Sequence, residues 1–321
     1  MIEIVGATGQ GVVLLRGDDG RWETVATAIE GAQCLAEGAG ALYCGSRGAG
    51  IWKSDDRGET WRALPFPAAD VFSLAVGPDG TVYGGCEPSM LFKSGDGGET
   101  WEELASLRSL PSAPTWSFPP RPWTSHVRWI APSPHDPRRL LVGIELGGLM
   151  VSEDGGETWH DHRPGAQRDV HSLAWHPSVP GRAYEAAGGG TAWSHDGGLT
   201  WRPVDAGRDR HYAWAVAVDP DDPDRWYVSA SPGPREAHRP GRAQAYVYRW
   251  VGGGPWERLD GGLPEPLDAM PYALLALPGR LYAGLADGRL YASGDGGETW
   301  DPVPLAAPPP ALVALVALVA L

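Results

Sequence analysis

The sequence predicts an all-β protein, a seven-bladed β-propeller built from four-stranded antiparallel blades and closed into a ring by a C-terminal strand. Glycine (45 residues), proline (31) and tryptophan (16) are abundant, which is typical of many short strands joined by tight turns. The pattern S-x-D-x-G-x-T-W occurs five times, beginning at Ser54, Ser94, Ser152, Ser194 and Ser293. Propeller blades repeat every ~40–45 residues, and the tryptophans that end these copies have a similar spacing.

One repeat unit can be read directly from residues 71–104. Short β-branched and aromatic runs alternate there with Pro/Asp/Gly turns, and the octapeptide at 94–101 separates the last two runs. The pattern predicts an antiparallel meander of roughly 40 residues. Its four expected strands are Val71–Val76, Thr81–Gly85, Met90–Lys93 and Trp101–Leu104.

Two degenerate copies of the octapeptide bring the number of units to seven. They lie at Arg16–Trp22 and Arg249–Trp256, and the seven tryptophans are then separated by 39, 40, 58, 42, 55 and 44 residues. The two long intervals indicate insertions at 104–125 and 232–245. We therefore expect residues 1–321 to form a single propeller domain.

The first unit lacks an inner strand. Strands are expected at Met1–Val5, Gly11–Leu15 and Trp22–Ala26, and nothing precedes them. The wholly apolar tail 311–321 is expected to complete this blade, because a strand buried on both faces reads as an unbroken apolar run and closure removes an exposed sheet edge. A short helix or an interaction tail is the alternative. The tail is shorter than the ~20 residues of a membrane helix, so no membrane partner is expected.

The octapeptide is expected to form a tight turn. The glycine at its fifth position can adopt a positive φ, and the aspartate two residues earlier can accept hydrogen bonds from local amides. The pattern resembles the Asp-box, or BNR repeat, of bacterial sialidases, sortilin-type receptors and photosystem II assembly factors. The resemblance covers the whole chain and implies a turn between third and fourth strands, away from the functional face. Calcium binding is the alternative, but the carboxylate spacing of a calcium loop is missing.

Charge and cysteine content exclude several classes of protein. The net charge of −14 argues against a nucleic-acid partner, because phosphate binding needs a basic surface. Three cysteines are an odd number and do not suggest a disulfide framework. The chain begins in strand-like sequence without a basic and apolar leader, so we expect a cytoplasmic protein.

Aligning the units places polar and aromatic residues at the central mouth of the propeller. The starts of inner strands carry His126, Arg128, Asp169, His171, Tyr212, Trp214 and Tyr272, with Arg210 and His211 beside them. The ends of second strands carry Arg47, Glu87 and Glu145, and Glu185 lies just inside the equivalent strand of the fifth blade. Polar groups gathered on one rim suggest a binding site, although a solvated rim whose charges pair with one another is the alternative.

Both insertions are expected to reach the same face. The first is stiffened by prolines and presents Trp116, Phe118 and Trp123, which could roof the mouth and stack on a sugar. The second would bring Arg235, His238 and Arg239 to the rim, or be a simple mobile loop. The expected ligand-binding set is Arg47, Arg128, His171, Arg210, His211, Tyr212, Trp214, Trp116 and Trp123.

Two classes of function remain open. In the first, the protein binds a small polar or carbohydrate-like ligand and is a hydrolase or lyase. Its candidate catalytic groups are Glu87, Glu145 and Glu185, with Glu87 and Glu145 as a glycosidase pair. A divalent metal on His126, His171 and His211 would be an alternative source of activated water.

The second class is a non-catalytic scaffold that binds a protein partner, as the resemblance to photosystem II assembly factors implies. A sialidase is disfavoured, because that resemblance would imply an Arg-Ile-Pro signature and six blades. The chain contains no Arg-Ile-Pro and predicts seven blades.

Overall fold

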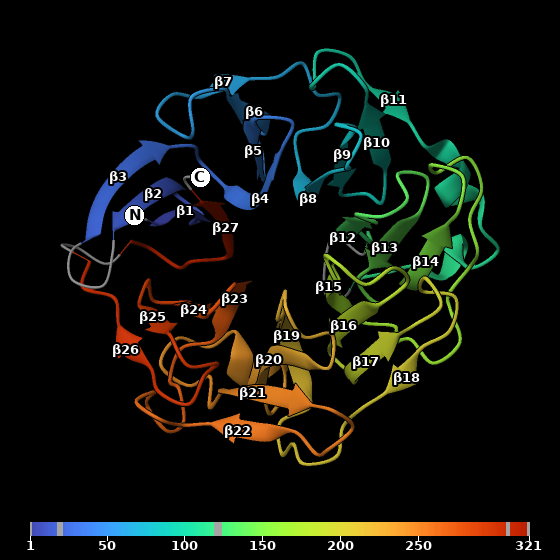
Figure 1. Ribbon diagram of the computed structural model, residues 1–321. Helices are drawn as coiled ribbons and strands as arrows, with labels where there is room; N and C mark the ends of the chain where they lie inside the picture. The colour runs from blue at the N-terminus through green and yellow to red at the C-terminus, as the bar shows by residue number, and fades with distance from the viewer. Residues whose placement is uncertain (1, 18–21, 119–123, 306–308, 320–321) are drawn as a thin grey trace.

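The computed structural model describes residues 2–17, 22–118, 124–305 and 309–319. They form seven antiparallel sheets arranged as blades around a central axis (Figure 1). The predicted seven-bladed propeller is therefore confirmed. No helix in the described part of the chain is long and apolar enough to cross a membrane.

Each sheet runs from an inner strand at the axis to an outer strand at the rim (Figure 1). In that order the first three sheets are β27 (Ala314–Val319), β1 (Ile2–Ala7), β2 (Gly11–Gly17), β3 (Trp22–Ala28); β4 (Ala32–Gly38), β5 (Ala41–Ser46), β6 (Gly50–Ser54), β7 (Arg62–Ala63); and β8 (Val71–Val76), β9 (Val82–Cys86), β10 (Leu91–Ser94), β11 (Glu102–Glu103).

The other four sheets follow the same order. They are β12 (Val127–Pro132), β13 (Leu140–Ile144), β14 (Gly148–Ser152); β15 (Val170–Trp175), β16 (Ala183–Ala187), β17 (Gly190–Ser194), β18 (Arg202–Pro203); β19 (Tyr212–Val218), β20 (Arg225–Ser231), β21 (Tyr246–Val251), β22 (Glu257–Leu259); and β23 (Pro271–Leu277), β24 (Arg280–Leu285), β25 (Leu290–Ser293), β26 (Asp301–Pro302).

The fourth blade has three full strands, and its outer strand is reduced to one bridge between Val151 and His160. Beyond this bridge the chain keeps one backbone hydrogen bond to the blade, from the N–H of Arg163 to the carbonyl of Leu149 at 3.0 Å. The carboxylate of Asp161 accepts hydrogen bonds from the backbone N–H and the hydroxyl of Ser112, at 3.0 and 2.5 Å. These bonds tie the segment after the bridge to the first insertion.

The C-terminal strand closes the ring. β27 pairs antiparallel with β1, from Ile2 opposite Val319 to Ala7 opposite Ala314. It lies between the inner strands β4 and β23 and contacts both of them, so it fills the gap in the ring of inner strands (Figure 1). The predicted closure is confirmed, and the helix or interaction tail is not what the structure shows.

The repeated octapeptide folds as a hydrogen-bonded turn between the third and fourth strands. Ser94 Oγ donates to Asp96 at 2.7 Å and accepts from the N–H of Gly98 at 2.8 Å. The Asp96 carboxylate also accepts the N–H and hydroxyl of Thr100. Gly98 has φ +97°, and a Cβ there would lie 2.4 Å from a Leu64 methyl. The expected turn chemistry is confirmed in this copy.

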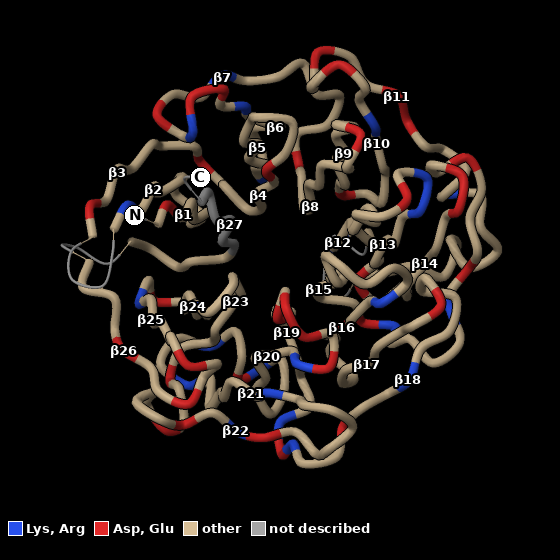
Figure 2. The backbone as a smooth tube through the Cα atoms, in the orientation of Figure 1, with Lys and Arg blue, Asp and Glu red and all other residues tan. Residues whose placement is uncertain are grey.

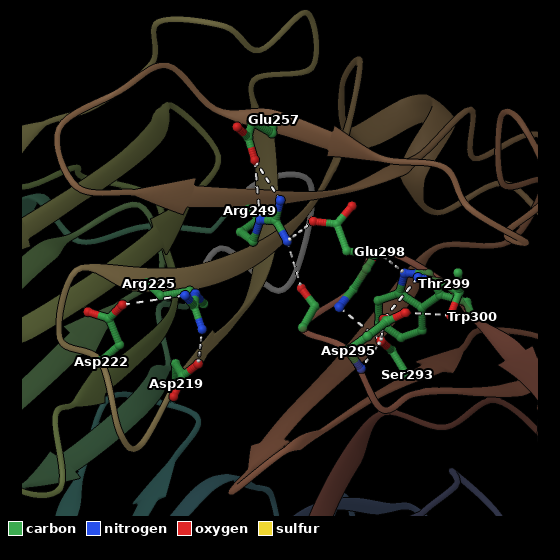
Figure 3. Close-up of polar contacts among 12 residues, drawn as sticks. Asp219, Asp222, Arg225, Arg249, Glu257, Ser293, Asp295, Glu298, Thr299 and Trp300 are labelled. Atoms are coloured by element: carbon green, nitrogen blue, oxygen red, sulfur yellow. Dashed lines mark hydrogen bonds and ion pairs between the residues drawn. The ribbon is translucent and has the colours of Figure 1, made fainter.

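The turn also links one blade to the next. Figure 3 shows the last copy, in which Asp295 accepts the Thr299 hydroxyl at 2.6 Å. Arg249 of the preceding blade donates to the carbonyl of Gly296 at 3.1 Å and forms an ion pair with Glu298 at 2.7 Å. The octapeptides therefore support the scaffold at the outer part of the blades.

The insertions contain the only helices of the described residues. The first carries two 3-10 helices, η1 (Ala105–Ser109) and η2 (Ala113–Thr115), and the second carries α1 (Pro234–Ala237). η1 and η2 pack beside the third and fourth blades through buried Leu107 and Trp116. The second insertion begins directly after β20, on the inner side of its blade.

We predict that Ser94→Ala destabilises the protein by about 1–3 kcal/mol, because it leaves the buried Gly98 N–H without its acceptor. The shift of the urea unfolding midpoint at constant slope measures the effect. Ser109→Ala, at an exposed serine of η1, is the matched control and should change stability by less than ~0.5 kcal/mol. Equal effects of the two variants would contradict a structural role for the turn.

We predict that a chain ending after Val313 loses the closed ring, because β1, β4 and β23 lose the strand between them. Its melting temperature should fall by on the order of 10 °C. The unpaired edge of β1 should also promote association between copies. Calorimetry and light scattering measure both effects, and a monomer with unchanged melting would show that β27 contributes little.

Candidate functional site

A hollow of about 530 Å³ opens at the central mouth, where inner strands begin and second strands end. It narrows into an apolar axial channel of about 260 Å³ that shares Gln33, Phe72, Arg128 and Trp214 with it. The side chains lining the hollow are Gln33, Arg47, Phe72, Glu87, Phe118, His126, Arg128, Glu145, Leu146, Asp169, Tyr212, Trp214, Pro234 and His238.

β-Bulges aim many of these side chains inward. The pairing between the inner and second strands shifts register at the start of β4, β8, β12, β15, β19 and β23. A bulge leaves one or more residues of a strand without a pairing partner. It thereby changes the direction in which their side chains point, compared with a regular strand. The residues left out include Gln33, Phe72, Arg128, His171, Trp214 and Tyr272.

Glu145 is the most strongly held carboxylate of the hollow. It follows β13, it is buried, and its Oε2 lies 2.5 Å from His126 Nε2 and 3.4 Å from Arg128 Nε. Burial alone would raise the pKa of Glu145, but the hydrogen bond from His126 and the charge of Arg128 prevail and hold it at about 2. Glu145 is therefore ionised at neutral pH.

His171 is fully buried and has one nitrogen with no partner. Its Nδ1 lies 2.6 Å from the carbonyl oxygen of Ala213, which can only accept, so Nδ1 carries the proton of the neutral ring. Nε2 has no hydrogen-bond partner and lies 3.6 Å from Asp169 Oδ2 and 4.0 Å from Glu145 Oε1. Burial lowers the pKa of His171 to about 4, despite the opposing charge of Glu145. The ring therefore presents a lone pair to two carboxylates.

Asp169 completes this group from the residue just before β15. Burial and the charge of Glu145 raise its pKa to about 6, although the N–H of Leu146 donates to it. Gly188 makes room for the carboxylate, since a Cβ there would lie 1.9 Å from Asp169 Oδ2. Leu146, between Glu145 and the glycines that begin β14, adopts φ +55°, a left-handed conformation uncommon for a leucine.

Aromatic rings form the walls. Arg128 lies over the Trp214 ring, 4.8 Å from its centroid, and Phe72 stacks on His126 at 3.9 Å. His238 packs edge-on against Trp214 and lies between two phenols, with Nε2 2.9 Å from the Tyr212 hydroxyl and Nδ1 2.8 Å from the Tyr272 hydroxyl.

Glu87 and Arg47 lie at the outer rim of the hollow. Glu87 accepts a hydrogen bond from the Thr124 hydroxyl at 2.5 Å and faces Arg47 at 3.7 Å. Arg47 in turn lies over the Phe72 ring. Both groups are more exposed than Glu145, with half of the Arg47 side chain accessible.

The structure brings together Arg47, Glu87, His126, Arg128, Glu145, Tyr212 and Trp214 in the lining, with His171 directly behind them. Arg210 and His211 do not line the hollow: Arg210 donates to the carbonyl of Gln244, and His211 is exposed. The expected set of His126, His171 and His211 is therefore not assembled around one point.

Glu185 and Trp116 also lie elsewhere. Glu185 is fully buried within its blade, where it accepts the N–H of Gln167, at 3.0 Å from the nearer carboxylate oxygen. Trp116 is buried among the side chains of the fourth blade and donates to Ser112, so it does not roof the mouth. Phe118 does reach the hollow, against His126. Trp123 falls outside the described residues.

Asp169 and His238 were not among the expected catalytic or ligand-binding groups. Asp169 was visible in the alignment two residues before His171, but an alignment of repeats does not show that its carboxylate lies near that of Glu145 in the neighbouring blade. Among the described residues, Glu145, Asp169 and His171 are the one group of His, Cys, Asp or Glu whose ligand atoms all lie within 4.8 Å of one another.

Acidic and basic residues are interspersed around the ring (Figure 2).

Comparisons with known proteins support the fold. No family model and no curated protein matches the sequence. The structure is similar to a GH74 xyloglucanase from Xanthomonas campestris (TM-score 0.66, 18% identity), over 95% of this chain and 47% of that one. It is also similar to YCF48 bound to a D1 peptide (TM-score 0.57, 18% identity), over 94% and 84% of the two chains.

A putative 6-phosphogluconolactonase from Bacteroides fragilis is a third similar structure (TM-score 0.67, 14% identity), over 99% and 98% of the two chains. The chain spans about half the length of the GH74 structures. At these identities the likeness establishes a shared propeller fold and nothing about the reaction.

We predict that Glu185→Gln is more stable than the wild type at high pH. Burial raises the pKa of Glu185 from 4.5 to about 8, so the folded chain keeps a proton that the unfolded chain releases. The stability that this proton contributes is complete below pH 4.5 and is lost as the pH rises towards 8. The free energy of unfolding of the variant should therefore rise relative to that of the wild type by about 1.4 kcal/mol per pH unit in that interval.

Urea unfolding of both proteins at a series of pH values measures this difference. Glutamine retains an oxygen that can accept the Gln167 N–H, so the comparison isolates the charge. Glu30→Gln, at an exposed position, is the control and should show no such trend. A pH-independent difference for Glu185→Gln would show that the carboxyl is not protonated in the folded protein.

Proposed function

We propose that the protein binds a small acidic, carbohydrate-like ligand at the central mouth and hydrolyses it or cleaves it by elimination. The observation that carries the proposal is the convergence of two arginines, three carboxylates and several aromatic rings on one hollow of about 530 Å³. Ligand sites are typically concave and largely apolar, with a few polar groups that fix orientation.

The cationic side chains favour an acidic ligand. Arg128 is buried against Trp214 and lines both the hollow and the channel beneath it. Its Nε has no hydrogen-bond partner, and its contact with Glu145 is an ion pair at 3.4 Å. A ligand carboxylate is a natural partner for a guanidinium, which binds it through paired N–H donors.

The aromatic walls favour a ring-shaped ligand with apolar faces. Phe72, Phe118 and Trp214 line the hollow from three different blades or loops. A sugar ring presents C–H groups on its faces and hydroxyls at its edge, which suits aromatic walls above a floor of carboxylates and histidines. The buried group of Glu145, Asp169 and His171, with pKa values displaced in opposite directions, is the expected reactive end of the site.

We predict that sugar acids such as glucuronate and galacturonate raise the melting temperature, and that neutral glucose and galactose do so less. Binding only to the folded state produces this stabilisation. Arg128→Gln should weaken binding of the acids at least tenfold, about 1.4 kcal/mol, because it removes a charge-assisted contact. Calorimetric titration measures the affinities.

Arg108→Gln is the matched control, because Arg108 is an exposed arginine of η1 whose ion pair is with Glu103, outside the hollow. Its affinity for sugar acids should equal that of the wild type. Equal binding of acidic and neutral sugars, or equal affinities of the two variants, would contradict the role of Arg128. Failure of every sugar to bind would contradict the proposed ligand class.

A protein segment is the second candidate ligand. It is favoured by the similarity to YCF48, a propeller whose solved structure contains a bound D1 peptide. A scaffold would use a broad surface, and substitutions within the narrow hollow would then leave partner binding unchanged. The Arg128 variant therefore helps to separate the two candidates.

A further inference from the structure

We infer that Glu145, Asp169 and His171 bind one first-row divalent cation, such as Mn²⁺ or Zn²⁺, at the floor of the central hollow. The role of this ion rests on the proposed function, because an ion at this point would face the bound ligand. The ion's protein ligands would all come from this chain, so its binding can be tested without any sugar.

The buried imidazole is the first argument. His171 is fully buried, yet its Nε2 has no hydrogen-bond partner. A buried polar atom without a partner is costly, and natural structures seldom keep one without a bound ion or water. Nδ1–H donates to the Ala213 carbonyl at 2.6 Å, which fixes the tautomer that leaves the Nε2 lone pair free. Histidines that bind metals are held in this way by a backbone carbonyl or carboxylate.

The distances are the second argument. Metal–nitrogen and metal–oxygen bonds to divalent zinc are ~2.0–2.2 Å, so two atoms bound to one ion lie up to ~4 Å apart. His171 Nε2 lies 3.6 Å from Asp169 Oδ2 and 4.0 Å from Glu145 Oε1. Without an ion, the same spacing leaves the nitrogen lone pair facing two carboxylate oxygens, and none of the three atoms provides a proton to another when the ring is neutral and both acids are ionised.

Contacts with neighbouring residues orient both carboxylates towards His171. His126 and Arg128 engage Glu145 through Oε2, which leaves Oε1 directed at His171. Asp169 accepts the N–H of Leu146, and Gly188 leaves space for its Oδ2. Two adjacent carboxylates repel each other unless a cation lies between them. With Arg128 beside them, the three ligands and this arginine carry a net charge of about −1 when both acids are ionised, which suits a divalent cation.

The donor set indicates the class of metal. One imidazole and two carboxylates suit first-row divalent ions, whereas calcium and magnesium prefer oxygen ligands alone. Among the described residues, no cysteine belongs to the group whose ligand atoms lie within 4.8 Å of one another. Three protein ligands leave coordination positions open for water or for the acidic group of a ligand.

The test is a titration of the chelator-treated full-length protein with Mn²⁺, followed by calorimetry and by electron paramagnetic resonance. We expect one ion per chain and a nitrogen coupling in the pulsed spectrum, which reports an imidazole ligand. Asp169→Asn should weaken binding at least tenfold, and His171→Gln should remove the nitrogen coupling. Circular dichroism checks that each variant is folded.

Two control variants should bind Mn²⁺ as the wild type does. Glu87→Gln removes a carboxylate from the same hollow, outside the expected ligand set. His160→Gln removes an exposed imidazole that lies 2.9 Å from Glu153 on the surface. Loss of binding in either control, together with retention in Asp169→Asn, would place the ion elsewhere and overturn the inference.

The Mn²⁺ titration and spectrum of the wild type test the ion site even if a variant fails to fold. Absence of stoichiometric binding, or a bound ion without nitrogen coupling, would overturn it. The outcome also separates this inference from the proposed function. Metal binding without any sugar binding would uphold the ion site and reject the ligand class. Sugar binding by a protein that takes up no metal would uphold the ligand class and reject the ion site.

Discussion

The candidate site depends on a β-bulge at the start of six inner strands. Regular antiparallel pairing would turn successive side chains alternately towards the two neighbouring blades. The bulge leaves one residue unpaired in five of these strands and two in β19, and in β12 and β15 the unpaired residues are Arg128 and His171. Ring closure by β27 then fixes the inner strands around one axis, so side chains from separate blades meet at its mouth.

The repeated turns lie in the outer part of the blades, whereas the candidate site lies at the central mouth. The octapeptide turns hold the outer half of the blades through repeated bonds such as those of Ser94 and Asp96, with their charges satisfied locally. The mouth is different, because Glu145 and His171 are buried with ionisation behaviour far from that of the free side chains. Titratable groups with perturbed pKa values in a cleft mark a candidate functional site.

Repetition explains what the sequence could predict. Five near-identical octapeptides and two degenerate copies predict the number and order of the blades, and the missing inner strand of the first blade indicates the role of the apolar tail. The alignment also located the mouth positions of Arg128 and His171. It could not show that Glu185 lies inside its blade or that Trp116 packs into the core, because these depend on side-chain packing and on an insertion without a repeat. The contact of Asp169 with Glu145 likewise joins separate blades.

Anomalous X-ray scattering from crystals grown with Mn²⁺ tests the central claim most directly. The account predicts one strong peak at bonding distance from Glu145 Oε1, Asp169 Oδ2 and His171 Nε2, with open coordination positions facing the hollow. The same peak should be absent from crystals of Asp169→Asn. Peaks only at surface carboxylates, with His171 Nε2 bonded to a water or to a protonated carboxyl group instead, would contradict it.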